Sequence, residues 1–335
     1  MRYSLCWRCL RWFTSLIYIL FFFVGCNPGL AEDEACWPDQ LLVKGTLKHR
    51  CGISSLVLDQ RGKAIIAGAE TDLAIWGIYN ENSLAIITKP ELSISSMSLS
   101  PDGKFLAVGN WDGMLEIWDM TTRTKKMSTP PHEGGVTSVT WSPDGAQLAT
   151  ASEDHGVRLI DTKTYKSVNL CGAHDGAVNA IAFSPDNRYF ASGGDDMRIK
   201  IWSPNGDELM TLDTNSAVLC IAISPDGKFL SSGENNGSIN IWEILTGKVA
   251  RELHRYKGKV FALIYACNGK RIITGGSDKN IRVWNALSGR MIMEHEGTHL
   301  AGIRALEKSE SVRCIYSADE KGQIVIWGAP VMCKN

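Results

Sequence analysis

The sequence has no excess of charge of either sign. Its 335 residues carry 35 Lys and Arg against 36 Asp and Glu, which leaves a formal net charge of −1 at pH 7. Nucleic-acid-binding proteins usually show a clustered basic excess, so this balance argues against nucleic acid as a partner. Hydrophobic residues make up 44% of the chain. This ordinary globular composition can form a large core without a metal or a disulfide.

Motifs that would indicate a cofactor or a metal are also missing. The chain has no GxxxxGK phosphate loop, no CxxCH haem attachment and no EF-hand spacing. The acidic pairs Glu153–Asp154 and Asp195–Asp196 fall at tight turns between expected strands, where Asp side chains bond to the local backbone. We therefore expect no cofactor and no metal.

The longest apolar run of the N-terminal region, Phe13–Gly25, is short. It is shorter than the ~20 residues of a typical transmembrane helix, and it follows a basic start that holds Arg2, Arg8 and Arg11. A basic segment followed by such a run is typical of a secretory signal peptide. Residues 1–25 are predicted to be a signal peptide or membrane anchor, and the chain is expected to be exported.

The end of this region leaves three alternatives for how the N-terminal segment is processed. The letters "FVGC" at Phe23–Cys26 resemble the lipobox of bacterial lipoproteins, although Phe23 stands where that motif usually has Leu. The resemblance implies that Cys26 is lipidated and tethers the protein to a membrane, facing the periplasm or the cell exterior. Cleavage at the small-x-small sequence Gly29–Ala31 would instead give a soluble protein. An uncleaved signal anchor is the third alternative, and an inward-facing anchor would give a cytosolic scaffold.

A tryptophan ends an alternating apolar segment again and again along the rest of the chain. These residues are Trp76, Trp118, Trp202, Trp242, Trp284 and Trp327. The intervals are 42, 84, 40, 42 and 43 residues, and the double interval has Ile160 of "VRLID" at its midpoint. Seven units of about 42 residues therefore follow one another, each with the period-2 alternation of short strands. Repetition at this period in strand-rich units points to a propeller.

A shared turn explains why the letters "SPDGKFL" occur identically at Ser100–Leu106 and Ser224–Leu230. Six units hold Gly or Asn at the last turn position: Gly62, Gly103, Gly145, Asn187, Gly227 and Gly269. Gly adopts positive φ freely and Asn does so better than most other residues. The same turn is predicted in each unit, and no ligand is needed to explain it.

With these repeats, residues 41–328 resemble the WD-repeat β-propeller family. The resemblance implies an all-β fold of seven blades, each a four-stranded antiparallel sheet, around a central channel. It also implies a network of His, Ser or Thr, Asp and Trp side chains inside each blade. The full set falls in one unit, at His174, Ser192, Asp196 and Trp202.

The other units hold partial sets. In the third unit Ile160 replaces the Trp, and in the last unit Lys321 stands where Asp is expected. Ser, His and Asp are also the residue types of a hydrolase triad, but no nucleophile elbow accompanies them. We therefore interpret the sets as structural.

The last unit lacks an outer strand of its own. Only residues 329–335 follow it, and Pro330 makes that tail a poor strand. The segment 41–47, "LLVKGTL", lies before the first unit and after a linker over residues 26–40. We predict that it closes the last blade and removes an exposed edge. This closure places Cys36 and Cys333 at the same end of an antiparallel pair, so a disulfide between them is predicted for an exported protein.

Partners of WD-repeat proteins often dock on the narrower face, at the residue before the turn Asp and at residues early in the inner strands. This resemblance implies a candidate partner-binding set at Trp111, Glu153, Asp195, Glu320, Phe261 and Arg304. Thr137 and Asn179 hold equivalent inner-strand positions. Trp, Phe and Arg are typical of binding hot spots, and the acidic members favour a basic or polar partner.

The expected function is thus a non-enzymatic scaffold that binds other proteins, as a monomer or as a subunit of a complex. The alternative is an enzyme or small-ligand binder that uses the central channel. That alternative requires charged or metal-binding residues on the inner strands, which are mostly apolar or small.

Overall fold

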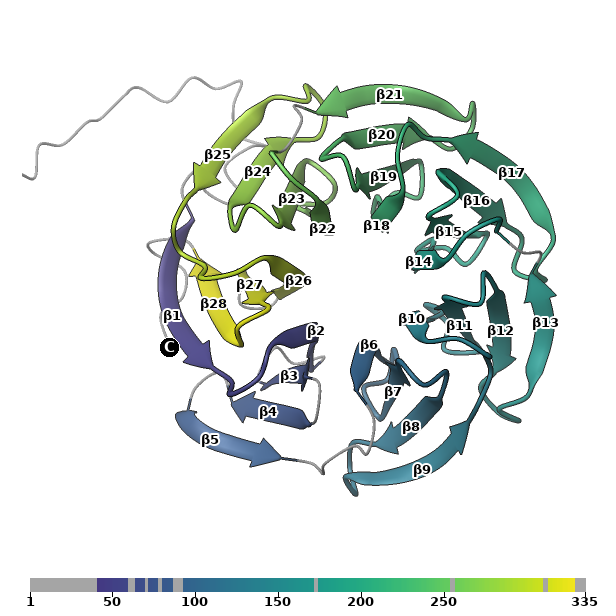
Figure 1. Ribbon diagram of the computed structural model, residues 1–335, viewed down its shortest axis with the longest axis horizontal. Helices are drawn as coiled ribbons and strands as arrows, with labels where there is room; N and C mark the ends of the chain where they lie inside the picture. Colours follow the sequence, from purple (N-terminus) through teal and green to yellow (C-terminus); the bar gives the residue numbers. More distant parts are fainter. Residues whose placement is uncertain are drawn as a thin grey trace, which may run out of the picture. The chain divides into compact units, whose positions relative to one another are not determined.

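The computed structural model describes residues 41–59, 64–69, 72–77, 80–86, 93–171, 174–253, 257–309 and 313–328. Within these ranges, 28 strands form seven four-stranded antiparallel sheets, and no helix is present. The sheets are arranged as blades around a common axis (Figure 1). The prediction of an all-β, seven-bladed propeller is therefore confirmed. The predicted lipid site, Cys26, and the predicted disulfide partners, Cys36 and Cys333, lie outside the described residues.

The blades are numbered in chain order, and blade 7 takes its outer strand from the start of the chain. Blade 1 is β2 (Ile53–Leu58), β3 (Ala64–Ala69), β4 (Leu73–Gly77) and β5 (Asn80–Ile86). Blade 2 is β6 (Ile94–Leu99), β7 (Phe105–Asn110), β8 (Leu115–Asp119) and β9 (Thr124–Thr129). Blade 3 is β10 (Val136–Trp141), β11 (Gln147–Ser152), β12 (Val157–Asp161) and β13 (Ser167–Cys171).

The remaining blades repeat this order. Blade 4 is β14 (Val178–Phe183), β15 (Phe190–Gly194), β16 (Arg198–Trp202) and β17 (Glu208–Asp213). Blade 5 is β18 (Val218–Ile223), β19 (Phe229–Glu234), β20 (Ile239–Glu243) and β21 (Lys248–Leu253). Blade 6 is β22 (Val260–Ala266), β23 (Arg271–Gly276), β24 (Ile281–Asn285) and β25 (Met291–His295). Blade 7 is β26 (Ile303–Ser309), β27 (Cys314–Asp319), β28 (Gln323–Gly328) and β1 (Leu42–Lys48).

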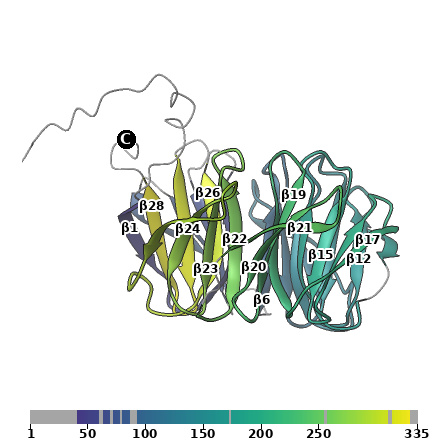
Figure 2. The same cartoon turned by 90° about the horizontal axis from the view of Figure 1, so that it is seen from above.

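The first strand of each blade lies nearest the axis and the fourth lies at the periphery (Figure 1). The antiparallel order therefore defines two faces, which Figure 2 shows edge-on. On the entry face, each inner strand begins and the second strand turns into the third. On the SPDG face lie the turns between the first and second strands and between the third and fourth strands. The described SPDG turns place Gly103, Gly145, Asn187, Gly227 and Gly269 at φ between 58° and 86°.

The N-terminal strand closes the ring, as predicted. β1 pairs antiparallel with β28 from Leu42 opposite Gly328 to Lys48 opposite Gln323. The strand thus begins and ends one residue later than the predicted segment 41–47. Leu41 is nevertheless buried, and its carbonyl oxygen lies 2.6 Å from His295 Nε2 at the end of blade 6.

The hydrophobic cores lie between blades and not inside them. One cluster joins Leu47 and Tyr316 of blade 7 to Ile53 and Trp76 of blade 1. The second strands are buried over most of their length because neighbouring blades cover both of their faces. Close approach also requires glycine: a Cβ atom on Gly193 of β15 would lie 2.5 Å from Val218 Cγ1 of blade 5. Each blade is therefore stabilised mainly by its two neighbours.

Polar side chains bridge neighbouring inner strands, whose axial edges have no partner strand. Ser54 Oγ donates to the carbonyl oxygen of Ile94 in the next blade at 2.7 Å, and Ser96 Oγ accepts the Val139 N–H at 3.1 Å. Thr137 and Asn179 bond in the same way to the blades that follow them. Small polar residues on these strands thus satisfy backbone groups that would otherwise lack a partner.

Candidate functional site

Blade 4 contains one continuous network of four buried side chains. Trp202 Nε1 donates to Ser192 Oγ at 2.8 Å, and Ser192 Oγ lies 2.8 Å from His174 Nε2. His174 Nδ1 lies 2.9 Å from the Asp196 carboxylate. The network joins the segment before β14 to β15, to the following turn and to the end of β16.

This geometry fixes the proton positions of the network. The His174 Nδ1–H donates to Asp196, so Nε2 of the neutral ring accepts the Ser192 hydroxyl proton. Burial lowers the pKa of His174, although the hydrogen bond to Asp196 opposes that shift. Ser192 has no exposed surface, and its hydroxyl is therefore closed to a substrate. The four side chains hold the blade together and do not form an open catalytic triad.

Blade 3 has a tryptophan on a different strand. Ile160 of β12 pairs with Leu148 of β11, which in turn pairs with Trp141 of β10. The indole therefore lies in the same row of the sheet, on the inner strand and not on the third strand. Its Nε1 donates to the carbonyl oxygen of Ser98 in blade 2 at 3.1 Å. His132 still lies 2.8 Å from Thr150 Oγ1 in this blade.

Blade 7 corrects one expectation from the sequence. Lys321 stands at the register of Asp196, but the acid that binds the histidine is Asp319, two residues earlier. His299 Nδ1 lies 3.2 Å from Asp319 Oδ2, and Trp327 Nε1 donates to Ser317 Oγ at 2.7 Å. Blade 7 therefore has a complete network, because the carboxylate enters from the end of β27 instead of from the turn.

In blades 1, 2 and 5, other acidic residues that the sequence pattern missed form contacts inside the blade. In blade 1, His49 Nε2 lies 3.0 Å from Oδ1 of the fully buried Asp72. In blade 2, Trp118 Nε1 donates to Glu116 Oε2 at 3.0 Å. In blade 5, burial raises the pKa of Glu234, which accepts a hydrogen bond from Asn240 Nδ2 at 2.7 Å.

The residues before the turn Asp hold equivalent places on the entry face. Each donates its backbone N–H to a carbonyl oxygen just before the inner strand of its own blade. These bonds are Trp111 to Ser93 (3.1 Å), Glu153 to Gly135 (3.0 Å), Asp195 to Ala177 (2.8 Å) and Glu320 to Gly302 (3.1 Å). Their side chains are exposed. The entry face therefore presents one such side chain at a fixed position in each of these blades.

Three candidate residues form one cluster at the junction of blades 6 and 7. The Arg304 guanidinium lies over the Phe261 ring, with its central carbon 3.8 Å from the ring centroid. Arg304 Nε also donates to Glu320 Oε1 at 2.7 Å. A Cβ atom on the neighbouring Gly302 would lie 3.3 Å from the Phe261 ring and 3.2 Å from Glu320 Oε2. The Arg304 side chain is thus held in one orientation while 43% of it stays exposed.

The other candidates lie in separate groups. Trp111 and Glu153 both approach Gly135, where an added Cβ atom would lie 3.0 Å from Trp111 Cε3 and from Glu153 Oε2. Asp195 accepts a hydrogen bond from Asn179 Nδ2 at 2.7 Å. The structure thus brings the candidates together around the rim in three groups, not in one continuous patch.

Charged residues occur on the inner strand of only one blade. Among the seven inner strands the charged residues are Arg304, Glu307 and Lys308, all on β26. Burial raises the pKa of Glu307 to about 7. No cluster of metal-binding side chains occurs in the described ranges.

In the same ranges, no helix has the length and apolar character required to span a membrane.

A seven-bladed propeller in which tryptophans end the third strands of most blades is a WD-repeat β-propeller. The comparison with family models gives the particular family: the chain belongs to the family described as the IFT122 first beta-propeller, whose model matches residues 135–330. A model of eukaryotic translation initiation factor eIF2A matches residues 58–162.

The matched relatives share short stretches with this chain. The LST8 homolog protein of Drosophila melanogaster is 36% identical over 16% of this chain and 18% of its own length. A periodic tryptophan protein 2 homolog of Neurospora crassa is 29% identical over 24% of this chain and 9% of its own length. The guanine nucleotide-binding protein subunit beta of Schizosaccharomyces pombe is 24% identical over 29% of this chain and 32% of its own length. The chain thus spans at most about a third of these relatives.

The buried histidine of blade 4 predicts a pH-dependent contribution to stability. Its pKa in the folded protein is lowered by burial, whereas the unfolded value is about 6.5. The stabilisation that it provides is therefore complete above pH 6.5 and decreases as the pH falls below that value. Its loss is at most about 1.4 kcal/mol per pH unit.

We expect His174→Asn to lower the free energy of unfolding most at pH 7.5 and less at pH 5.5, as measured by urea denaturation. The comparison uses the difference between variant and wild type, because the raised pKa values of Glu234 and Glu307 act in the opposite direction. Trp202→Phe is the control, since it disrupts the same network without removing a titratable group. A His174→Asn difference that stays constant or widens toward low pH would contradict the neutral, buried imidazole.

Proposed function

We propose that this propeller is a protein-binding scaffold that holds its partner on the entry face. The cluster of Phe261, Arg304 and Glu320 is the observation that carries the proposal. Arginine and aromatic side chains dominate binding energy at protein interfaces. Here the ring and the carboxylate already orient the guanidinium, so little side-chain entropy is lost when a partner binds.

The rest of the rim supports a multi-point contact. Trp111 is 49% exposed, an unusual fraction for such a large apolar side chain. Glu153 and Asp195 are exposed on the two blades that follow it. These acids favour a partner that presents basic or polar groups, because complementary charge steers association and rejects like-charged partners.

The named relatives fit this proposal at a general level. The relative from Schizosaccharomyces pombe is, by its name, a subunit of a larger assembly. From this relative we take only one part of the proposal: that this propeller also acts as one subunit of a protein complex. The identity of its partner is open, and no enzymatic activity is proposed.

Replacing Trp111, Phe261 and Arg304 together by Ala is expected to reduce partner capture without unfolding the protein. Trp111 and the stacked pair of Phe261 and Arg304 act as two anchors, so the affinity should fall by about 100-fold or more. The measurement is affinity capture of the tagged protein from membranes with quantitative mass spectrometry, and thermal unfolding checks the fold.

A matched control replaces two leucines and one arginine on the SPDG face. Leu245 is 88% exposed, Leu287 is 77% exposed, and the Arg188 side chain is 82% exposed. Changing these three residues to Ala should leave capture unchanged. Capture that survives the Trp111, Phe261 and Arg304 changes, or that the control abolishes, would place the interface elsewhere.

We also propose that the protein is exported and tethered to a membrane through lipid on Cys26. The support is the basic, apolar and small-residue order of the first 26 residues. Stable anchoring needs two membrane-binding signals, for example two acyl chains, which a lipidated N-terminal cysteine can supply.

In a bacterium that processes lipoproteins, the wild-type chain should incorporate labelled palmitate and remain with membranes. Cys26→Ser should lose the label, and Cys36→Ser should keep it. A wild-type chain that is unlabelled and soluble after export would show cleavage at the Gly29–Ala31 sequence instead. A labelled Cys26→Ser chain would exclude Cys26 as the lipid site.

A further inference from the structure

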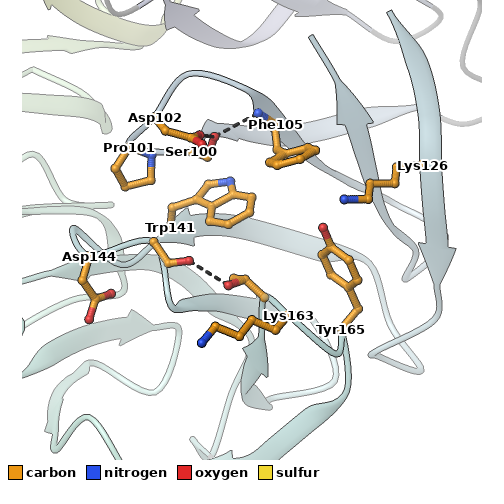
Figure 3. Close-up of a pocket in the computed structure, with 11 residues that line it drawn as sticks. Ser100, Pro101, Asp102, Phe105, Lys126, Trp141, Asp144, Lys163 and Tyr165 are labelled. Carbon is orange, nitrogen blue, oxygen red and sulfur yellow. Dashed lines mark hydrogen bonds between the residues drawn. The ribbon is translucent and has the colours of Figure 1, made fainter. Parts of the chain in front are cut away.

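A cavity of about 360 Å³ opens on the SPDG face between blades 2 and 3 (Figure 3). It lies on the face opposite the partner-binding candidates, and none of those candidates lines it. Two neighbouring SPDG turns, at Ser100–Gly103 and Ser142–Gly145, contribute to its wall. The outer strand β9 and the turn between β12 and β13 complete the lining. A volume of this size falls within the range of ligand sites in proteins.

Three aromatic side chains give the cavity an apolar lining. Phe105, Trp141 and Tyr165 come from β7, β10 and the turn before β13, and their rings surround the same space (Figure 3). Trp141 is 7% exposed and bonded through Nε1 to blade 2, so it is a rigid part of the lining. The tryptophan that blade 3 lacks on its third strand is therefore placed where it borders this cavity.

Two lysines supply positive charge, and neither forms a direct ion pair within the described residues. Lys126 Nζ lies 4.3 Å from the centroid of the Phe105 ring and 5.6 Å from that of Tyr165. Lys163 also lines the cavity. Among the described residues, neither ammonium group lies within ion-pair distance of an acid. Lys126 and Lys163 do help to lower the pKa values of the exposed Asp119 and Asp161, but a ligand anion in the cavity could still approach both ammonium groups.

The two acids of the lining are already engaged in their own turns. Asp102 accepts the Ser100 hydroxyl at 2.7 Å and lies 3.3 Å from Lys104 Nζ. Asp144 accepts the Ser142 hydroxyl at 2.6 Å. These carboxylates are held by hydrogen bonds within the SPDG turns. They therefore neutralise only part of the positive charge of the two cavity lysines.

The backbone at Tyr165 adopts a conformation that bulky residues rarely adopt. Tyr165 has φ of 56° and donates its N–H to Asp161 at 2.7 Å. The same turn in blades 5 and 6 places Gly247 and Gly289 at this position, with φ of 66° and 72°. A bulky residue in the left-handed region is strained. Blade 2 has Arg123 at this position with φ of 59°, so the strain is not peculiar to the cavity; in blade 3 the residue held there supplies an aromatic wall.

We propose that this cavity binds a peptide segment of a partner protein in which an aromatic side chain stands next to a carboxylate. The aromatic side chain enters between Phe105, Trp141 and Tyr165, and the carboxylate reaches Lys126 and Lys163. The scaffold then has a second binding site, on the face opposite the rim that contains Trp111.

The test uses the protein labelled with 5-fluorotryptophan and observed by fluorine NMR, with the Trp141 resonance assigned through Trp141→Phe. The probe is the peptide acetyl-Gly-Phe-Asp-Gly-amide. We expect it to shift the Trp141 resonance with a dissociation constant of about 1 mM or below. The peptides with Lys in place of Asp, or with Gly in place of Phe, should bind about tenfold more weakly or worse.

Free N-acetyl-phenylalanine separates a peptide site from a small-molecule site. It carries the same aromatic and carboxylate groups, and we expect it to bind more weakly than the peptide. Equal or tighter binding of the free acid would overturn the assignment to a protein partner. No shift of the Trp141 resonance at probe concentrations about tenfold above the expected constant would overturn the site itself.

Two pairs of variants separate binding from folding. Tyr165→Gly should abolish the shift without lowering the melting temperature more than Arg123→Gly does. Arg123 is the matched control, because it has φ of 59° in the equivalent turn of blade 2 and does not line the cavity. Lys126→Met keeps the apolar stem and should weaken the peptide about fivefold or more, whereas Lys166→Met should not.

Unchanged binding by Tyr165→Gly or by Lys126→Met would contradict the proposal, as would equal loss in the control variants. If Tyr165→Gly fails to fold, Lys126→Met decides the question alone. The variant with Ala at Trp111, Phe261 and Arg304 should bind the peptide normally. The cavity and the entry-face interface can therefore fail or succeed independently.

Discussion

Every blade of this protein has two apolar faces, and no blade can cover either face by itself. The hydrophobic clusters join residues of adjacent blades, as Leu47 and Ile53 do across the junction of blades 7 and 1. Gly193 has no Cβ, and this allows the Val218 side chain of the next blade to pack closely. Because the contact is always with a neighbour, the ring has to close. β1 closes it, and its pairing with β28 joins the two ends of the described chain.

Within the blades, one structural task is performed by different residues. Blade 4 joins its strands through His174, Ser192, Asp196 and Trp202. Blade 7 draws its carboxylate from Asp319 at the end of a strand. Blade 3 has no indole in its network, because Trp141 on its inner strand bonds to blade 2 instead. Such exchange is possible because the network of each blade requires only that a buried donor meets an acceptor. The residues that supply these groups can stand at different positions in the sequence. The rigid frame that results leaves both faces free to carry different side chains.

The repeat made the fold predictable. The spacing of the tryptophans and the turn letters determine the number of blades, and the shortage of strand residues after Trp327 indicates which segment has to complete the ring. The pairing of Asp319 with His299 was not predictable by register, because the acid is displaced by two residues from the family position. Likewise, Asp72 lies in a loop outside the repeat pattern and meets His49 only through the fold.

The two proposed sites also differ in how far the sequence could predict them. The rim candidates occupy repeat positions, so the sequence could place them on one face, although it could not show that Arg304 lies over Phe261. The cavity was not predictable, because its lining comes from four separate segments between Ser100 and Tyr165. Its one local indication is the tyrosine at a position where the equivalent turns of blades 5 and 6 have glycine, although that of blade 2 has Arg123.

Ring closure by the N-terminal strand is tested most directly by the oligomeric state of a chain that begins at Gly52, compared with one that begins at Leu41. Size-exclusion chromatography with light scattering and circular dichroism measure both state and fold. The chain from Leu41 should be a folded monomer. The chain from Gly52 should aggregate, because the edge of β28 and the apolar side chains that β1 covers become exposed. A soluble, monomeric and fully folded chain from Gly52 would contradict the account.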